Sequence, residues 1–349
     1  MNKNKLTIII ILAVIALLHF VFIYFFFVRS SGSDKKELLV PEPTVIPPPA
    51  RTMKSDEPTP VHQKKNFIPK TERFNYSNSV NGKMKSIPEM SDVRNGILVE
   101  AGTGRVLWTL DPYEAVPIAS MTKMMTLLVA LEQINNRNLS MDEMVTVSRT
   151  AVLVKPTIAG LRPDDQLPLK TLLQSMIVKS ANDCAQTAAE YFGGGNADKF
   201  IEMMNATGAR LDMKRSVFSN PHGLPEKKGK NDNRSSCEDL AILSLALMRY
   251  PEAREWVAMR EVTFKEDGPK GPIRFLNHNH RLLSSKQCPG VDGIKTGFTQ
   301  RAGFCIAASC ERNGKRLIAV VAGCSSQRSR DELVKKLFNW GYLRLERMP

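Results

Sequence analysis

The sequence has few features of a metal-binding or zinc-stabilised protein. None of its six cysteines forms a Cys-x-x-Cys pair, and no histidine lies at zinc-finger spacing from them. The two histidines of NHNHRLL, residues 277–283, have no third histidine or carboxylate cluster beside them. We therefore expect no metal and no cofactor. A disulfide is compatible with a domain outside the cytoplasm, but the cysteine spacing predicts no connectivity.

The chain also lacks the clustered positive charge of a nucleic-acid-binding protein. Its net charge is +14, but lysine and arginine are spread along the chain, with only short pairs such as Lys64-Lys65 and Lys227-Lys228. Diffuse positive charge suits an anionic polymer or a membrane surface instead. We expect no nucleic-acid partner, and the sequence contains no internal repeat.

Charged residues are missing from Leu6 to Val28, and this apolar run is long enough to span a hydrocarbon core of ~30 Å. A cleavable signal peptide would have a shorter apolar run and an Ala-x-Ala-type exit, whereas this run ends in FFFVRSSGSD. We therefore expect residues 1–28 to be an uncleaved single-pass anchor. The following chain would then lie outside the cytoplasm.

The next segment is poor in apolar residues and rich in proline. Residues 41–60 contain seven prolines, which favour extended and poorly packed chain. We interpret residues 29–90 as a tether, and residues 91–349 as the folded domain. A proline-rich docking site for a partner is the alternative reading of the same segment.

Strand patterns occur at both ends of the folded part, and helical patterns lie between them. A hairpin is expected at 96–110, and two strands at 303–310 and 316–323 are joined by the turn signal Asn313-Gly314. Helices are expected near 120–133, 169–191, 197–208 and 236–249, with an amphipathic helix at 330–345. This order predicts an α/β (α+β) fold. Its antiparallel sheet combines the N- and C-terminal segments and is covered by helices, beside a mostly helical subdomain.

The first candidate for chemistry is Ser120-Met-Thr-Lys123. Positions three apart share one face of a helix, so the lysine can reach the hydroxyl. A serine becomes a nucleophile when a neighbouring base takes its proton, and a lysine serves when its pKa is depressed. The alternative is a helix N-cap beside a surface lysine.

Two further short motifs follow. Ser180-Ala-Asn182 interrupts a helical pattern, where its hydroxyl and amide can relay a proton and bind a substrate amide, or simply cap the next helix. Lys295-Thr-Gly297 precedes a strand, where it offers a cation, a hydroxyl and a residue without a side chain to a substrate, or forms a plain turn. Each motif alone is weak evidence.

The order of the three motifs is the signature of penicillin-binding proteins and class A β-lactamases. With the flanking blocks TGRVLWTLDPYEAVPIASMTKMMT, FSNPHGLP, GVDGIKTGFT and LFNWGY, the chain resembles the serine D-alanyl-D-alanine carboxypeptidases of peptidase family S11. These are low-molecular-mass penicillin-binding proteins. The resemblance implies a serine β-lactamase/DD-peptidase-like fold and attachment to the bacterial inner (cytoplasmic) membrane, with the catalytic domain facing the periplasm or cell exterior.

The resemblance also implies a mechanism. Ser120 would be acylated by the penultimate D-alanine of a peptidoglycan stem pentapeptide, which expels the terminal D-alanine, and Lys123 would act as base. Ser180 would assist proton transfer, and Asn182 would help to position the substrate. The amides of Ser120 and Phe298 would form an oxyanion hole, and β-lactam antibiotics would be covalent inhibitors.

The remaining implied residues bind substrate. Lys295, Thr296 and Gly297 would line the substrate strand, and Arg330 matches an arginine that the family associates with the terminal carboxylate. The alternative for Arg330 is a helix-surface residue near Asp331. His222 is expected to be structural, because no Gly-x-Ser-x-Gly elbow pairs with it.

Three other functions remain open. A D,D-endopeptidase that cuts peptidoglycan cross-links is favoured by a chain that stops near the end of the catalytic domain. A β-lactamase is disfavoured because no Glu-x-x-Leu-Asn loop is present. A non-enzymatic cell-wall-binding scaffold is disfavoured by the intact motifs. The NHNHRLL stretch replaces a shorter Asn-x-Asn stretch of the family, so we make no prediction of contacts there.

Overall fold

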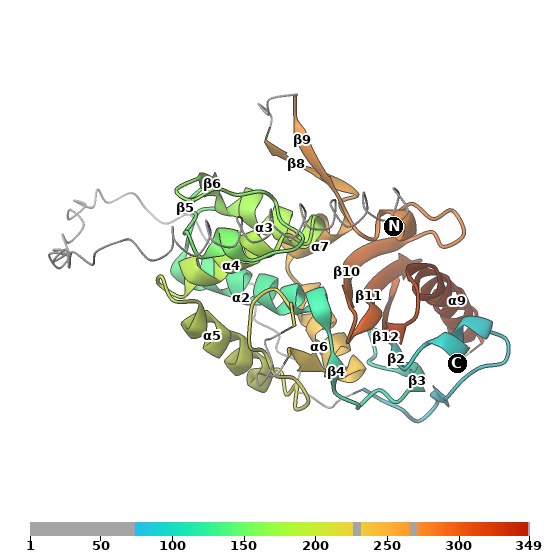
Figure 1. Cartoon of the computed structure of the whole chain (residues 1–349). Helices are drawn as coiled ribbons and strands as arrows, with labels where there is room; N and C mark the ends of the chain where they lie inside the picture. The colour runs from blue at the N-terminus through green and yellow to red at the C-terminus, as the bar shows by residue number, and fades with distance from the viewer. Residues whose placement is uncertain (1–73, 226–231, 266–270, 348–349) are drawn as a thin grey trace, which may run out of the picture. The chain divides into compact units, whose positions relative to one another are not determined.

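The computed structural model describes residues 74–225, 232–265 and 271–347, which lie in one compact unit, Phe67–Pro349 (Figure 1). The predicted anchor and residues 29–73 of the predicted tether lie outside the described residues. Among the described residues, no helix has the length and apolar character needed to cross a membrane.

The folded unit begins earlier than the boundary predicted at residue 91. Residues 74–90 already contribute a short strand, β1 (Val80–Asn81), and the start of the 3-10 helix η1 (Pro88–Asp92). Ile87 and Met90 are buried in the core beside the C-terminal helix. These two apolar side chains hold residues 74–90 against the core, although the composition of this segment is mostly polar, as in a linker.

The central sheet has six strands in the order β1-β3-β2-β12-β11-β10. Its strands β2 (Asn95–Glu100), β3 (Val106–Leu110), β10 (Val291–Thr299), β11 (Gly303–Arg312) and β12 (Lys315–Cys324) pair antiparallel, and only β1 pairs parallel, with β3. The N-terminal hairpin therefore joins the C-terminal strands through β2 and β12, as predicted. Strand β10 is left as one edge of the sheet.

Alternating side chains of the sheet pack against different helices, because successive residues of a strand point to opposite faces. Leu98 of β2 packs in the cluster that contains Leu337 and Phe338 of α9 (Gln327–Glu346). Its neighbours Ile97 and Val99 belong to the cluster built with the remaining helices. The sheet thus lies between α9 on one face and the helical subdomain on the other, which Figure 1 shows.

The helical subdomain contains the predicted helices and some that the sequence did not reveal. The longer helices are α2 (Thr122–Arg137), α3 (Leu169–Val178), α4 (Asn182–Phe192), α5 (Ala197–Arg210), α6 (Cys237–Leu247) and α7 (Pro251–Ala258), with a short α8 (His280–Leu283). Short helices η2 (Ala119–Met121) and η3 (Ala151–Leu153) and strand pairs β4–β7 (Val116–Pro117, Arg234–Ser235) and β5–β6 (Met144–Thr146, Gln166–Pro168) complete it.

The hairpin β8–β9 (Glu261–Lys265, Ile273–Leu276) was not predicted and projects beside α3 and α7 (Figure 1).

Two turns lie where the sequence predicts a break or a turn. The predicted helix at 169–191 is two helices, because Ser180 has a left-handed φ of 63° that interrupts the helix. Asn313 and Gly314, with φ of 50° and 71°, form the tight turn between β11 and β12.

The packing of Gly96 on β2 predicts a stability change. A Cβ at this position would lie 2.5 Å from two ring atoms of Trp108, and the indole nitrogen of Trp108 is held by the Gly82 carbonyl at 2.8 Å. Because that ring is fixed at its far end, we expect Gly96→Ala to reduce the free energy of unfolding by about 1–3 kcal/mol, measured by urea denaturation. Gly102→Ala, whose Cβ would be 3.4 Å from its nearest neighbour, is the matched control. Equal effects of the two substitutions would contradict this packing argument.

Candidate active site

The Ser120 hydroxyl and the Lys123 amine lie next to each other at the start of α2. Ser120 is in the 3-10 turn η2, and Lys123 is in the first turn of α2. Their Oγ and Nζ atoms are 3.1 Å apart. Lys123 is fully buried, and neither η2 nor α2 has a side-chain N-cap bond. The alternative of an N-cap serine beside a surface lysine is therefore wrong.

Two other contacts orient the Lys123 amine. Nζ donates to Asn182 Oδ1 at 2.6 Å and to the His222 carbonyl at 2.7 Å. A neutral amine has two N–H donors and one lone pair. With both donors directed at these oxygens, the lone pair is left facing the Ser120 hydroxyl. This arrangement suits a base that takes the hydroxyl proton.

The orientation of Asn182 is set by its own partners. Its side-chain nitrogen donates to the Pro156 carbonyl, so Oδ1 is turned toward Lys123, and its backbone amide donates to the Thr157 carbonyl at 2.8 Å. The next residue, Asp183, fastens the same loop. Its carboxylate accepts from the amides of Ala159 and Gly160 at 2.9 and 3.0 Å. The loop at 156–161 is thus held to the N-terminus of α4.

The loop that carries the His222 carbonyl is held against the nucleophile turn. A Cβ on Gly223, which has φ of +82°, would lie 1.9 Å from the Ala119 carbonyl oxygen, so only glycine allows this approach. Asn233 ties the loop to α2, because its Nδ2 donates to Thr122 Oγ1 at 2.9 Å and to the Asn220 carbonyl at 2.8 Å. These contacts account for the structural role expected of FSNPHGLP.

The Lys295-Thr-Gly297 motif lies on β10, the edge strand of the sheet. Lys295 and Thr296 are buried, and Lys295 Nζ donates to the Thr296 carbonyl at 3.2 Å. A Cβ on Gly297 would be 2.8 Å from the Ile118 carbonyl. The glycine therefore lets the nucleophile turn approach the strand, whereas the sequence suggested that it makes room for substrate.

Three buried basic side chains, Lys123, Lys295 and Arg330, dominate the electrostatics of the site. Burial, aided by the charge of Lys295, lowers the pKa of Lys123 well below that of a free lysine. Burial and the charge of Arg330 lower the pKa of Lys295 to about 7. Both shifts favour the neutral amine, and Lys295 titrates close to neutrality.

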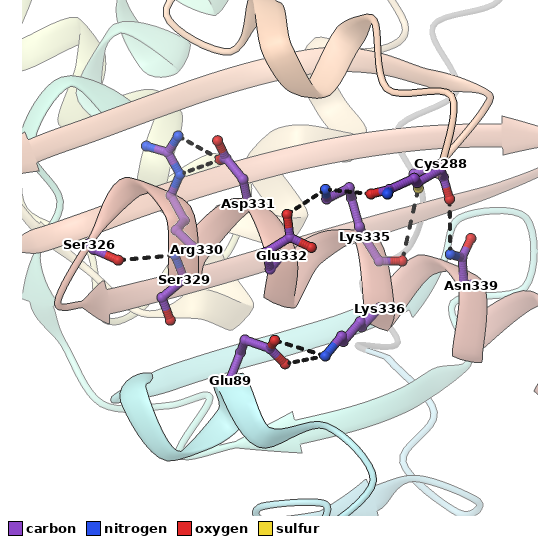
Figure 2. A network of polar contacts seen from close by, with 11 residues as sticks. Glu89, Cys288, Ser326, Ser329, Arg330, Asp331, Glu332, Lys335, Lys336 and Asn339 are labelled. Atoms are coloured by element: carbon purple, nitrogen blue, oxygen red, sulfur yellow. Dashed lines mark hydrogen bonds and ion pairs between the residues drawn. The ribbon is translucent and has the colours of Figure 1, made fainter.

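Arg330 lies in the first turn of α9 and is buried. The alternative that it is an exposed arginine on the helix surface is therefore wrong. Its Nε and Nη2 donate to Asp331 Oδ1 at 2.9 and 2.6 Å (Figure 2). The turn itself is capped by Ser326, whose side chain accepts from the Ser329 amide at 3.0 Å. Asp331 is thus its ion-pair partner, as the alternative suggested. The guanidinium is nevertheless buried, and its charge adds to burial in lowering the pKa of Lys295.

The remaining candidates lie around this centre. Ser180 is buried in the left-handed turn before Asn182. Phe298, at the exposed end of β10, stacks on Phe304 with ring centroids 4.2 Å apart. In NHNHRLL, partial burial and the charges of Lys295 and Lys179 lower the pKa of His278 to about 4. The described residues contain no group of three potential metal ligands.

Three contributors to the site were not singled out from the sequence. They are the His222 carbonyl, Asp183 and Asn233. The first accepts a hydrogen bond from Lys123, and the other two hold loops of the site in place. The available signal for Asp183 was its position directly after the Ser180-Ala-Asn182 motif, whereas no local pattern pairs Asn233 with a distant loop.

Comparison with known proteins assigns a family. A model of the D-alanyl-D-alanine carboxypeptidase family, peptidase S11, matches residues 82–326. A D-alanyl-D-alanine carboxypeptidase, DacF, from Bacillus subtilis is 31% identical over 258 residues, which are 74% of this chain and 64% of that protein. The chain thus spans slightly less than two thirds of that relative. A D-alanyl-D-alanine endopeptidase from Pseudomonas aeruginosa is 30% identical, over 63% of this chain and 68% of the relative.

Solved structures of penicillin-binding proteins have a similar fold. Penicillin-binding protein 6B from Escherichia coli has a TM-score of 0.67 and 32% identity, covering 77% of this chain and 81% of that one. Penicillin-binding protein D2 from Listeria monocytogenes, in its cefotaxime-bound form, has a TM-score of 0.62 and 29% identity, covering 72% of this chain and 97% of that one. The predicted DD-peptidase-like fold is therefore confirmed.

Proposed function

The chain belongs to the D-alanyl-D-alanine carboxypeptidase family, peptidase S11, and from this premise we propose that it removes the terminal D-alanine from peptidoglycan stem pentapeptides. The observation that carries the proposal is the buried Lys123 amine, 3.1 Å from Ser120 Oγ, with both of its N–H groups engaged elsewhere. This is the arrangement that a serine hydrolase needs to generate its nucleophile without a histidine.

In the proposed acylation, Ser120 Oγ attacks the carbonyl carbon of the penultimate D-alanine while its proton passes to Lys123 Nζ. Collapse of the tetrahedral intermediate releases the terminal D-alanine, and the proton held by Lys123 passes to the leaving nitrogen with the help of Ser180. Water then attacks the ester carbonyl carbon while Lys123 again accepts a proton. The bond from this carbon to Ser120 Oγ breaks, the shortened peptide leaves, and Lys123 returns the proton to Ser120. β-Lactams acylate the same oxygen, which accounts for the penicillin-binding and cefotaxime-bound relatives.

Residues at the start of α2, on β10 and on α9 position the substrate. The backbone amides of Ser120 and Phe298 supply the oxyanion hole, a contribution worth about 3 kcal/mol per donor in other hydrolases. An extended stem peptide adds to the free edge of β10 beside Thr296 and Gly297. Its terminal carboxylate is held by Lys295 and by the Nη1 side of Arg330, which the pairing with Asp331 does not use.

A D,D-endopeptidase is the second candidate, because one relative carries that name. Both reactions cleave after a D-alanine through the same acyl-enzyme. They differ in the leaving group, which is free D-alanine in one and the side-chain amine of a neighbouring stem peptide in the other.

We further propose that residues 6–28 anchor the chain in the bacterial inner membrane, with the folded unit described above outside the cytoplasm as the catalytic domain. The uncharged run and the extracytoplasmic location of peptidoglycan support this. We expect the full chain to remain in membranes after alkaline carbonate washing and to be released as a soluble protein when residues 1–28 are deleted. Release of the full chain by the wash would contradict the anchor.

Substituting Ser120 tests the proposed activity. Ser120→Ala leaves Lys123 and the loops in place, so we expect a folded protein whose release of D-alanine falls about 10³-fold or more. The wild type should give a penicillin adduct on the Ser120 peptide by mass spectrometry, and the variant none. Equal labelling would show that Ser120 is not the nucleophile. If the wild type cleaves cross-linked muropeptide dimers faster than pentapeptides, the endopeptidase is the correct activity.

The pKa shifts predict the pH dependence of kcat/KM. Lys123 must be neutral to act as base, so the rate should rise as pH passes upward through its lowered pKa. Lys295 must be charged to bind carboxylate, so the rate should fall above about pH 7, the pKa of Lys295 in the free enzyme. In Lys295→Arg, which stays charged, the alkaline limb should move to higher pH.

Lys123→Arg is the matched control, because arginine keeps the positive charge and cannot lose its proton. We expect this variant to be inactive throughout the range in which the wild type works. NMR of labelled lysine side chains reports protonation directly. A Lys123 amine that stays fully protonated across the active range would exclude it as base.

A further inference from the structure

Two buried cysteines lie on neighbouring segments, away from the candidate active site. Cys288 is in the loop before β10, Cys310 is within β11, and both are almost fully buried. Cys310 Sγ lies 3.4 Å from the carbonyl oxygen of Pro289, the residue next to Cys288. A third group completes the cluster, because Arg312 Nη2 lies 3.1 Å from Cys288 Sγ.

The backbones that carry the two cysteines are fastened to each other. The Glu311 amide donates to the Gly290 carbonyl at 2.8 Å, and the Pro289 carbonyl accepts from Arg312 Nε at 2.8 Å and from Cys310 Sγ at 3.4 Å. Because these contacts fix the segments on either side of the sulfurs, the approach of the two thiols is part of the fold.

Helix α9 covers the same loop from the other side. Cys288 Sγ faces the Lys335 carbonyl at 4.0 Å, and Asn339 Nδ2 donates to the Gln287 carbonyl at 3.1 Å (Figure 2). The Cys288 side chain is therefore held between β11 and α9. The segments that carry the two cysteines are thus fixed beside each other, as a disulfide between them requires.

We propose that Cys288 and Cys310 are a disulfide-forming site, oxidised by a disulfide compound such as an oxidised dithiol protein or glutathione disulfide. In the first step, one of the two cysteines attacks a sulfur of the oxidant as its thiolate, and one thiolate leaves. The other cysteine then attacks the protein sulfur of the mixed disulfide, giving its proton to the second departing thiolate. The two cysteines lose two electrons and two protons, and the oxidant becomes two thiols.

The Arg312 guanidinium lies beside the pair, with Nη2 3.1 Å from Cys288 Sγ. A nearby cation stabilises a thiolate, which is the attacking form. One of the two cysteines therefore attacks first, and the other resolves the mixed disulfide.

The other four cysteines are buried and serve as internal controls. Burial raises the pKa of Cys305 to about 11 and that of Cys324 to about 12, and it raises the pKa values of Cys184 and Cys237 well above that of a free thiol. Cys305 Sγ is directed at the carbonyl of Ala302, 3.4 Å away. We expect these four to remain reduced under the same oxidant.

The test uses the full chain incubated with glutathione disulfide and then alkylated, digested with trypsin and analysed by mass spectrometry. We expect the peptide 287–295 linked to 302–312, with fragment ions placing the bond on Cys310 and not on Cys305. Cys305→Ala should keep the link, and Cys310→Ala should lose it. Unlinked peptides, a link through Cys305, or a glutathione adduct that never resolves would each overturn the proposal.

Thermal unfolding provides a second readout that needs no variant of the active site. A bond between residues 288 and 310 restricts the unfolded chain, so the oxidised wild type should melt about 5 °C or more above the reduced wild type. Cys288→Ala should melt at the same temperature before and after oxidation. An oxidised wild type that gains no stability would show that the bond strains the fold and is not a native site.

Discussion

The arrangement of the site depends on one constraint, which is the burial of the Lys123 amine without a paired carboxylate. Burying a charged ammonium is costly unless a counterion accompanies it, and the neighbouring charge with the largest effect on Lys123 is that of Lys295, which is positive and outweighs that of Asp183. The neutral amine is therefore favoured. Its two N–H groups find acceptors in Asn182 and the His222 carbonyl, and its lone pair faces Ser120.

The rest of the site holds those acceptors in place. The Pro156 and Thr157 carbonyls fix Asn182, while Asn233 fixes the loop before Gly223. Each support comes from a different part of the chain, so the base is defined by the convergence of loops on α2. The edge strand β10 approaches the same turn because Gly297 has no side chain.

Much of the fold could be predicted from the sequence because its signals are local. The turn at Asn313-Gly314 and the hairpin at 96–110 depend on residues a few positions apart, and both are present. Residues 74–90 were misassigned because their composition is that of a linker, whereas Ile87 and Met90 gain stability only from contacts with distant elements.

The sequence by itself determined the family, the order of the three motifs and the reach of Lys123 to Ser120, since a spacing of three on a helix fixes a shared face. Only the tertiary structure decided the protonation bias of Lys123, the burial of Arg330 and the close fit of Gly297 against Ile118. It also decided which of the six cysteines lie on neighbouring segments, because Cys310 contacts the residue next to Cys288. Burial, charge neighbours and the pairing of distant segments arise from packing, and local sequence patterns do not encode which segments meet.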